Sequence, residues 1–114
     1  MDAMPITMAQ EMGAWSSQIK DVIAQYEFTS EKIQQLAIGG TAVGTGINAH
    51  PDLSTKVCDL LNSQTGLNFR SAENFFQAIS TQDSSVLLSA SNRSLAVALT
   101  KISNDLRWMN SGPI

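Results

Sequence analysis

The stretch that decides the fold is LAVALTKISNDLRWM, residues 95–109. Its large apolar side chains recur in steps of four and three residues, which places them on one face of an α-helix and does not fit a half-buried strand. Small side chains among them would let neighbouring helices approach closely on the other faces. We predict a helix over residues 82–110 that ends at the Ser-Gly-Pro sequence of residues 111–113. The apolar series is Leu95, Leu99, Ile102, Leu106 and Met109, and the small residues include Ser89, Ala90, Ser91, Ser94, Ala96 and Ala98.

A second long helix is predicted near the start of the chain, over residues 7–36. Thr7 is a suitable N-cap, and Gln10 stands three residues later, where a capping box places its reciprocal partner. Pro5 holds the preceding residue in an extended conformation and so marks the boundary. The same four-and-three spacing links Met8, Met12, Trp15, Ile19, Val22 and Tyr26.

The segment between the long helices is richer in glycine and more broken. Residues 39–46 contain four glycines, a density that no helix interior tolerates at a cost of about 1 kcal/mol per glycine. We therefore predict a loop over residues 38–46, the glycine-rich loop. Short helices are predicted over residues 52–64, with Thr65 and Gly66 as the stop, and over residues 72–79, joined by a connector over residues 67–71.

The composition suggests that the helices are covered on more than one face. Hydrophobic residues make up 43% of the 114 residues and charged residues only 15%. Two long helices joined by a short one leave much of this apolar surface uncovered. The predicted fold is all-α: a long-helix bundle fragment forming one domain over residues 1–114, completed by other copies of the chain. Trp15 and Trp108 are expected in the core rather than at a ligand.

Several classes of function are disfavoured by charge and composition. The net charge is −3 without a basic cluster, which argues against nucleic-acid binding. No apolar run reaches the ~20 residues that span a bilayer, and residues 1–6 lack the features of a secretion signal. The single cysteine, Cys58, is expected to be a buried thiol in a reducing cytoplasm. With one histidine and one cysteine, a structural zinc site is not expected.

Candidate functional residues are few. The glycine-rich loop follows a predicted helix rather than a strand and lacks the Lys-Ser/Thr ending of a phosphate-binding loop. His50 is the only histidine, yet no residue that would form a catalytic relay stands at a telling spacing, so a surface or capping role is favoured over catalysis. Gln10 and Glu11 are explained by capping and by the helix dipole.

A polar cluster interrupts the last helix. Lys101 and Asp105 are four residues apart and can pair across one turn, while Asn104 lies on a different face from the apolar series. Two interpretations of Lys101, Asn104, Asp105 and Arg107 stay open: a network on the helix surface, or the lining of a pocket.

At this point the wording of the sequence resembles the class II fumarases of the fumarase/aspartase superfamily. Residues 2–11, DAMPITMAQE, resemble the family stretch Asp-Ala-x-Pro-x-Thr-x-Gly-Gln-Glu, with Ala9 in place of glycine. Residues 36–48, LAIGGTAVGTGIN, match the fumarase loop almost letter for letter. Residues 101–107, KISNDLR, resemble the signature Lys-Ile-x-Asn-Asp-x-Arg. Gly40 and Val43 favour fumarase over aspartase, where alanine and isoleucine are expected.

The resemblance implies a parent enzyme that reversibly hydrates fumarate to malate, a small dicarboxylate, without metal or other cofactor. It implies abstraction of a C3 proton and stabilisation of an aci-carboxylate intermediate. It also implies a homotetramer whose long helices form a central bundle, with each active site shared among three subunits. Asn48, Asn104 and Arg107 match positions near those pockets, where supporting or orienting roles are expected.

The family's catalytic residues are not matched by this chain. The Thr-His pair precedes the Asp-Ala-x-Pro stretch, and the catalytic serine loop follows the Ser-Gly-Pro ending, so the chain is expected to be the central oligomerisation segment and inactive alone. His50 is not the family's catalytic histidine, and Ala90 stands where relatives commonly have glycine. The alternatives are an aspartate ammonia-lyase segment and a non-catalytic helical assembly module.

Overall fold

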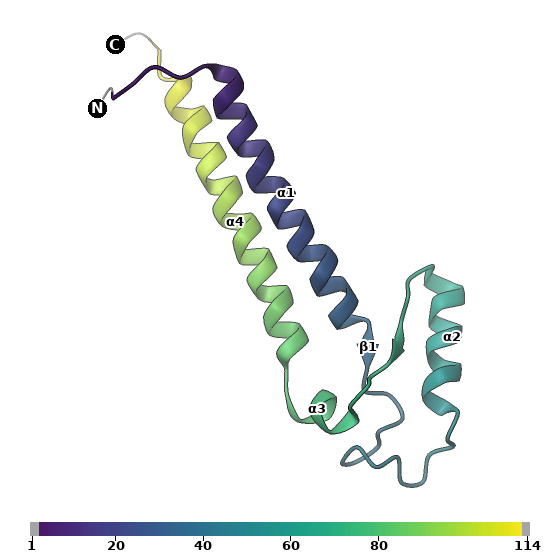
Figure 1. The fold of residues 1–114 in the computed structure, drawn as a ribbon. Coiled ribbons are helices and arrows are strands. Elements are labelled where there is room, and N and C mark those ends of the chain that lie inside the picture. The colour runs from purple at the N-terminus through teal and green to yellow at the C-terminus, as the bar shows by residue number, and fades with distance from the viewer. Residues whose placement is uncertain (1–2, 113–114) are drawn as a thin grey trace. The chain divides into compact units, whose positions relative to one another are not determined.

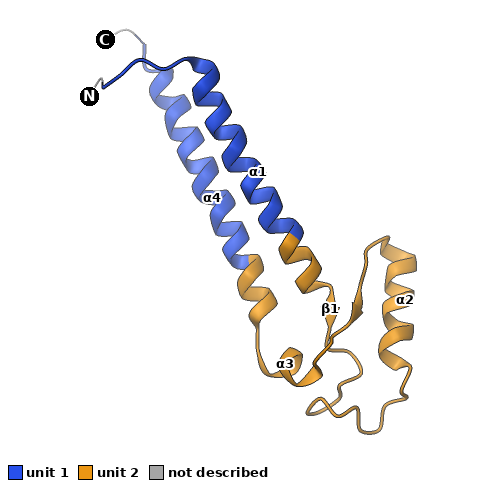
Figure 2. Ribbon diagram, viewed as in Figure 1, with its two compact units in different colours: residues 1–27, 89–114 blue, residues 28–88 orange. Residues whose placement is uncertain are grey.

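The computed structural model describes residues 3–112, and the residues at the two ends that the resemblance used, Asp2 and Pro113, lie outside this range. The chain divides into two compact units (Figure 2). Within the described residues, unit 1 takes in residues 3–27 and 89–112, and unit 2 is Phe28–Leu88. The elements in chain order are α1 (Met8–Ile33), β1 (Gln35–Leu36), α2 (Leu53–Thr65), β2 (Arg70–Ser71), α3 (Phe75–Ser80) and α4 (Asp83–Met109), as Figure 1 shows.

The N-terminus of α1 is held by the predicted capping box. The backbone N–H of Thr7 donates to Oε1 of Gln10 at 2.9 Å, and the N–H of Gln10 donates to Oγ1 of Thr7 at 3.2 Å. These two bonds satisfy donors that have no acceptor within the helix. The predicted helix start is therefore confirmed.

The C-terminus of α1 differs from the prediction, which carried the helix to Leu36. The helix ends at Ile33, and Gln35–Leu36 form a short strand instead. This strand pairs in parallel with Arg70–Ser71, through N–H···O bonds of 2.9 Å from Arg70 to Gln34 and from Ala72 to Leu36. The predicted helix end was wrong because the carbonyls of Gln34 and Leu36 accept hydrogen bonds from the neighbouring strand rather than from a further helical turn.

The predicted connector over residues 67–71 therefore contains β2. The side chain of Asn62 holds the turn that precedes this strand. The amide of Asn62 donates to the carbonyl of Phe69 at 2.9 Å and accepts from its N–H at 2.5 Å. Gly66 caps α2 in the left-handed conformation, with its N–H bonded to the carbonyl of Asn62. The helix stop predicted at Thr65 and Gly66 is confirmed.

The next helix, α3, begins at Phe75 rather than Ala72, because the side chain of Asn74 accepts from the N–H of Gln77 and so caps this helix.

Within unit 1, α1 and α4 lie side by side and antiparallel (Figure 1), since Trp15 bonds to Asp105 near one end and Tyr26 bonds to Asn92 further along. On α1 the predicted face is confirmed from Trp15 onward: Trp15 and Ile19 are half-buried and Val22 is buried. Met8 and Met12 of the same series are exposed.

On α4 the two most buried residues are small ones, Ser91 and Ala98, each 3% exposed. Of the predicted apolar series, Leu95 and Ile102 are half-buried, whereas Leu99 is 48% and Leu106 is 51% exposed. The apolar series is therefore only partly covered, because small side chains fit the narrow space between the two helices. Trp108, expected in the core, is 72% exposed.

The glycine-rich loop has the unusual backbone that its composition predicted. Gly39, Gly44 and Gly46 have positive φ, as do the non-glycine residues Thr41 and Asn48. At Gly44 the backbone also runs against α3, because a Cβ there would lie 2.9 Å from Cδ1 of Phe76 and 3.1 Å from its N. The loop therefore depends on glycine at this position for two independent reasons.

Replacing Gly44 by alanine is expected to destabilise the chain by about 2 kcal/mol, because φ of 104° and the close contact with α3 both oppose a side chain. Urea unfolding followed by circular dichroism measures the change. Gly13→Ala is the matched control: it lies within α1 with nothing within 4 Å of the new Cβ, so it should stabilise by about 0.5–1 kcal/mol. Equal effects of the two changes would contradict this account.

Candidate functional site

The strongest polar arrangement in unit 1 joins α1 to α4, and we call Glu11, Trp15, Lys101 and Asp105 the charged cluster. Nζ of Lys101 donates to Oε1 of Glu11 at 2.9 Å and also pairs with the carboxylate of Asp105. Nε1 of Trp15 lies 3.1 Å from Oε1 of Glu11 and 3.2 Å from Oδ2 of Asp105. Two carboxylates thus share two donors, and Lys101 also lies 5.9 Å from the centre of the Trp15 ring.

The cluster shifts the ionisation of two of its members. The hydrogen bond from Lys101 lowers the pKa of Asp105 below its ordinary value of 3.8, and the hydrogen bond from Trp15 acts in the same direction. The hydrogen bonds to Asp105 and Glu11 raise the pKa of Lys101 above 10.5. Both shifts favour the charged forms near neutral pH. Lys101 and Asp105 are therefore held as an ion pair at neutral pH.

The sequence anticipated only half of this cluster. The pairing of Lys101 with Asp105 is confirmed, and so is the network interpretation for these two residues. Glu11 was assigned to the helix dipole, but it accepts from Lys101 and Trp15 instead. The only available signal was that Glu11 and Trp15 stand four residues apart on the face of α1 that carries the apolar series.

The three residues expected to support a substrate pocket are all exposed. Asn104 and Arg107 project from adjacent turns of α4 in unit 1. Asn48 belongs to unit 2, two residues after the glycine-rich loop, with φ of 62°. None of the three lines a cavity described below. His50 is exposed and its Nδ1 accepts from the N–H of Asp52 at 3.2 Å, so it caps a turn. Cys58 is buried, as predicted.

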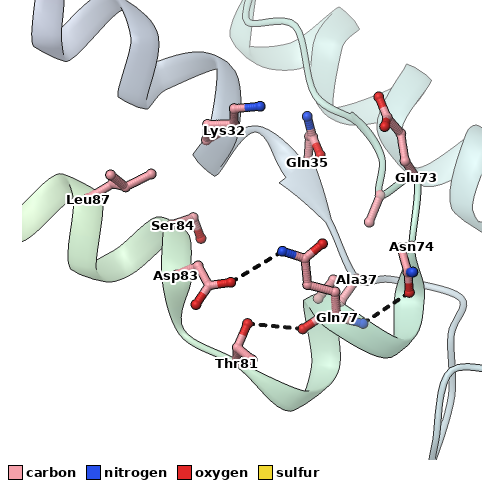
Figure 3. A pocket seen from close by; sticks show the side chains of 12 residues that line it. Lys32, Gln35, Ala37, Glu73, Asn74, Gln77, Thr81, Asp83, Ser84 and Leu87 are labelled. Carbon is pink, nitrogen blue, oxygen red and sulfur yellow. Dashed lines mark hydrogen bonds between the residues drawn. The ribbon is translucent and has the colours of Figure 1, made fainter.

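A cavity of about 380 Å³ in unit 2, the α3 cavity, is shown in Figure 3. Gln77 spans it: its side chain donates to Asp83 at 3.3 Å and its carbonyl accepts from the hydroxyl of Thr81 at 3.2 Å. Lys32 supplies a positive charge, and Glu73 and Asp83 supply negative charges. Most of the polar groups of the cavity belong to the ends of α3 and α4. Sequence patterns gave no indication of this cavity, because its lining comes from two separate stretches, residues 32–37 and 72–87.

A shallow groove runs between α1 and α4 within unit 1. Val22 and Ala98 are buried beneath it, at 5% and 3% exposed, and Val97 beside them is 63% exposed. Asp21 and Arg93 contribute charges of opposite sign to its lining. The groove thus combines an apolar floor with a charged edge, which suits protein contact better than a small ligand.

Two further features bear on function. Across residues 3–112, no three histidine, cysteine, aspartate or glutamate side chains gather where they could hold a metal ion. In the same range, no helix is long and apolar enough to cross a membrane.

The sequence model of a protein family described as Lyase matches residues 1–114 of this mostly helical chain. The chain belongs to this family. Within it, the resemblance to class II fumarases is confirmed by curated relatives. Fumarate hydratase class II 2 of Pseudomonas aeruginosa is 50% identical to this chain over 114 residues. Fumarate hydratase class II of Thermus aquaticus is 49% identical over 113 residues.

Solved structures agree with the sequence relatives. A class II fumarase from Schistosoma mansoni has a TM-score of 0.91 at 32% identity, over 98% of this chain and 26% of its own. A fumarate lyase:delta crystallin from Brucella melitensis, bound to cobalt, has a TM-score of 0.87 at 34% identity, over 98% of this chain and 24% of its own. The alignment with the Pseudomonas relative takes in 100% of this chain and 25% of the relative. The alignment with the Thermus relative takes in 99% of this chain and 24% of the relative. It thus spans about a quarter of the relatives it matches.

The charged cluster generates a prediction about pH. Lys101→Met should lower the unfolding temperature at pH 7, because it leaves two half-buried carboxylates with Trp15 as their remaining donor. The depressed pKa of Asp105 contributes stability above pH 3.8 that is lost as pH falls through its lower folded value. The difference from the unchanged chain should therefore shrink in acid. Calorimetry between pH 2 and pH 8 measures it.

Lys20→Met removes the same charge from an exposed position on α1 and serves as the control. It should change the unfolding temperature little at any pH in this range. If the two variants lose the same stability at neutral pH, the cluster does not stabilise the pairing of α1 with α4.

Proposed function

We propose that this chain supplies the oligomerising helical scaffold of a fumarate hydratase, an enzyme that reversibly hydrates fumarate to malate. The observation that carries the proposal is the sequence similarity to class II fumarate hydratases over the whole chain. It fits the structure, in which the charged cluster joins α1 to α4 and the side chains of Thr7 and Asn74 cap helices. In this proposal, residues 1–114 form the central helical segment of a cytoplasmic lyase that uses no metal or other cofactor.

Exposed surface supports assembly with other copies of the chain. Within unit 1, large apolar side chains of α4 are exposed: Leu99 is 48%, Leu106 51% and Trp108 72% exposed. Apolar side chains of this kind are typical of the core of an obligate subunit interface. A homotetramer, in which α1 and α4 of each copy join one central bundle, would cover them.

The groove in unit 1 is the part of this surface best suited to a second copy. Its floor, Val22 and Ala98, is apolar, and Val97 projects beside it. Asp21 and Arg93 give it one charge of each sign, which can match the reversed pair on a symmetry-related copy. Association through this groove buries apolar surface that the chain cannot cover by itself.

The substrate pocket of the assembled enzyme would be completed by parts of the protein that this chain does not match. In that assembly we assign Asn48, Asn104 and Arg107 to supporting or orienting roles at the pocket. All three are exposed, as residues that contribute to a shared site need to be. An arginine and two amides are suitable partners for the carboxylates of a dicarboxylate substrate.

A test of activity separates the proposal from its alternatives. The 114-residue chain mixed with malate should give no rise in ultraviolet absorbance from fumarate, whereas an assembly containing the catalytic segments should turn over. Turnover by the chain alone would contradict the scaffold proposal. Release of fumarate from aspartate, and not from malate, by such an assembly would favour the alternative of an aspartate ammonia-lyase.

Assembly is expected to depend on the groove. The unchanged chain should show the mass of an oligomer in light scattering, and Val97→Glu should weaken association by at least about tenfold, because it places an unpaired charge in an apolar contact. Gln64→Glu makes a charge change at an exposed position of α2 and should leave the mass unchanged. A stable monomer in the unchanged chain would contradict the bundle proposal. An oligomer with no activity in any assembly would favour the alternative of a non-catalytic helical assembly module.

A further inference from the structure

A second cavity of unit 2, which we call the α2 cavity, lies between the glycine-rich loop and the first turn of α2. It encloses about 350 Å³, which is within the range of small-ligand pockets, about 300–1,000 Å³. Gly39, Gly44 and Gly46 line it from the loop. Polar groups come from four side chains of the other lining segments, those of His50, Ser54, Thr55 and Ser71.

One lining residue carries a buried polar atom that no other group satisfies. Ser54 is 7% exposed, and its Oγ has no hydrogen-bond partner. Among residues 3–112 it is the one buried side-chain oxygen or nitrogen in this state. A buried hydroxyl without a partner costs free energy, so such an atom calls for a ligand or a water that completes it.

The same cavity receives the N-terminus of a helix of 13 residues. Asp52, at the N-cap of α2, makes no side-chain hydrogen bond to the helix. The N–H groups of Leu53 and Lys56 donate to the carbonyls of His50 and Asp52, each at 3.0 Å. Between them lie the N–H groups of Ser54 and Thr55, in the first turn, where donors have no acceptor within the helix and favour negative charge.

The histidine at the edge of the cavity can add a further donor. Nδ1 of His50 accepts from the N–H of Asp52 at 3.2 Å, so the proton of the neutral ring is on Nε2. The carboxylate of Asp52, which would repel an anion, lies 3.9 Å from Nζ of Lys56 and is not part of the lining. The lining therefore offers donors without a fixed negative charge.

From these observations we infer that the α2 cavity binds a small oxyanion, a phosphate or a carboxylate, on the hydroxyl of Ser54 and the first-turn N–H groups of α2. No lysine or arginine lines the cavity, so we expect weak binding, with a Kd of about 1 mM. Gly39 keeps the loop close to the site, since a Cβ there would lie 3.1 Å from Cβ of Ser54. This inference is independent of the proposed function, and either can fail without the other.

Nuclear magnetic resonance on the ¹⁵N-labelled 114-residue chain tests the inference. Inorganic phosphate and acetate are titrated in separate arms, with sodium chloride at matched ionic strength as the reference. The amide signals of Ser54 and Thr55 should shift to saturation with at least one oxyanion and not with chloride. Saturation with phosphate alone assigns a phosphate group, and saturation with acetate alone assigns a carboxylate.

Substitution then ties the binding to the buried hydroxyl. Ser54→Ala should weaken binding of the oxyanion by at least about tenfold, because a hydrogen bond to a charged group is lost. Ser63→Ala removes an exposed hydroxyl from the other end of α2 and should bind as the unchanged chain does. Without added anion, Ser54→Ala should unfold at the same or a higher temperature, since the missing hydroxyl had no partner.

Three outcomes would overturn the inference. The first is that neither oxyanion shifts the two amides more than chloride does, which would mean that an ordered water alone serves Ser54. The second is equal binding by Ser54→Ala and the unchanged chain. The third is a lower unfolding temperature for Ser54→Ala without anion, which would show that the hydroxyl is already bonded.

Discussion

Contact between only two helices limits what the chain can bury. Two helices side by side cover one strip of each, and in unit 1 the most deeply buried side chains of that strip are Val22, Ser91 and Ala98. Every other face stays in contact with solvent. Large apolar side chains on those faces, Leu99 and Leu106 among them, therefore stay about half exposed in the single chain. The scaffold role proposed above gives these side chains a purpose, because further copies of α1 and α4 would cover them.

The charged cluster fixes the register between α1 and α4, whose other contacts specify it only weakly. Small and apolar side chains allow two helices to slide along one another at little cost. Lys101 can reach Glu11 and Asp105 together only in one register. Paired charges that remain partly exposed contribute modestly to stability, but they penalise the wrong alignment. The same cluster leaves none of its strong donors free for a substrate.

The sequence predicted the helices well because their signals are local. The spacing of apolar residues, the Thr7–Gln10 capping box and the stop at Gly66 all act within a few residues. The side of α4 that meets α1 was not predictable in this way. Periodicity shows which residues share a face, but not which neighbour that face meets, and the leucine series was the more apolar choice. The strand pair and the Glu11–Lys101 contact join residues that lie 35 and 90 positions apart, for which no local pattern exists.

The pairing of β1 with β2 has a consequence for how this family can vary. It brings Leu36 and Ser71 together, so the ends of the intervening segment are adjacent whatever lies between them. The entropy of closing such a segment grows only with the logarithm of its length, by about 0.6 kcal/mol for each doubling. Evolution can therefore lengthen, shorten or replace α2 and its flanking turns cheaply. The strand pair separates the two long helices from such length changes, so insertions and deletions among relatives are expected in α2 and the connector that follows it rather than in α1 or α4.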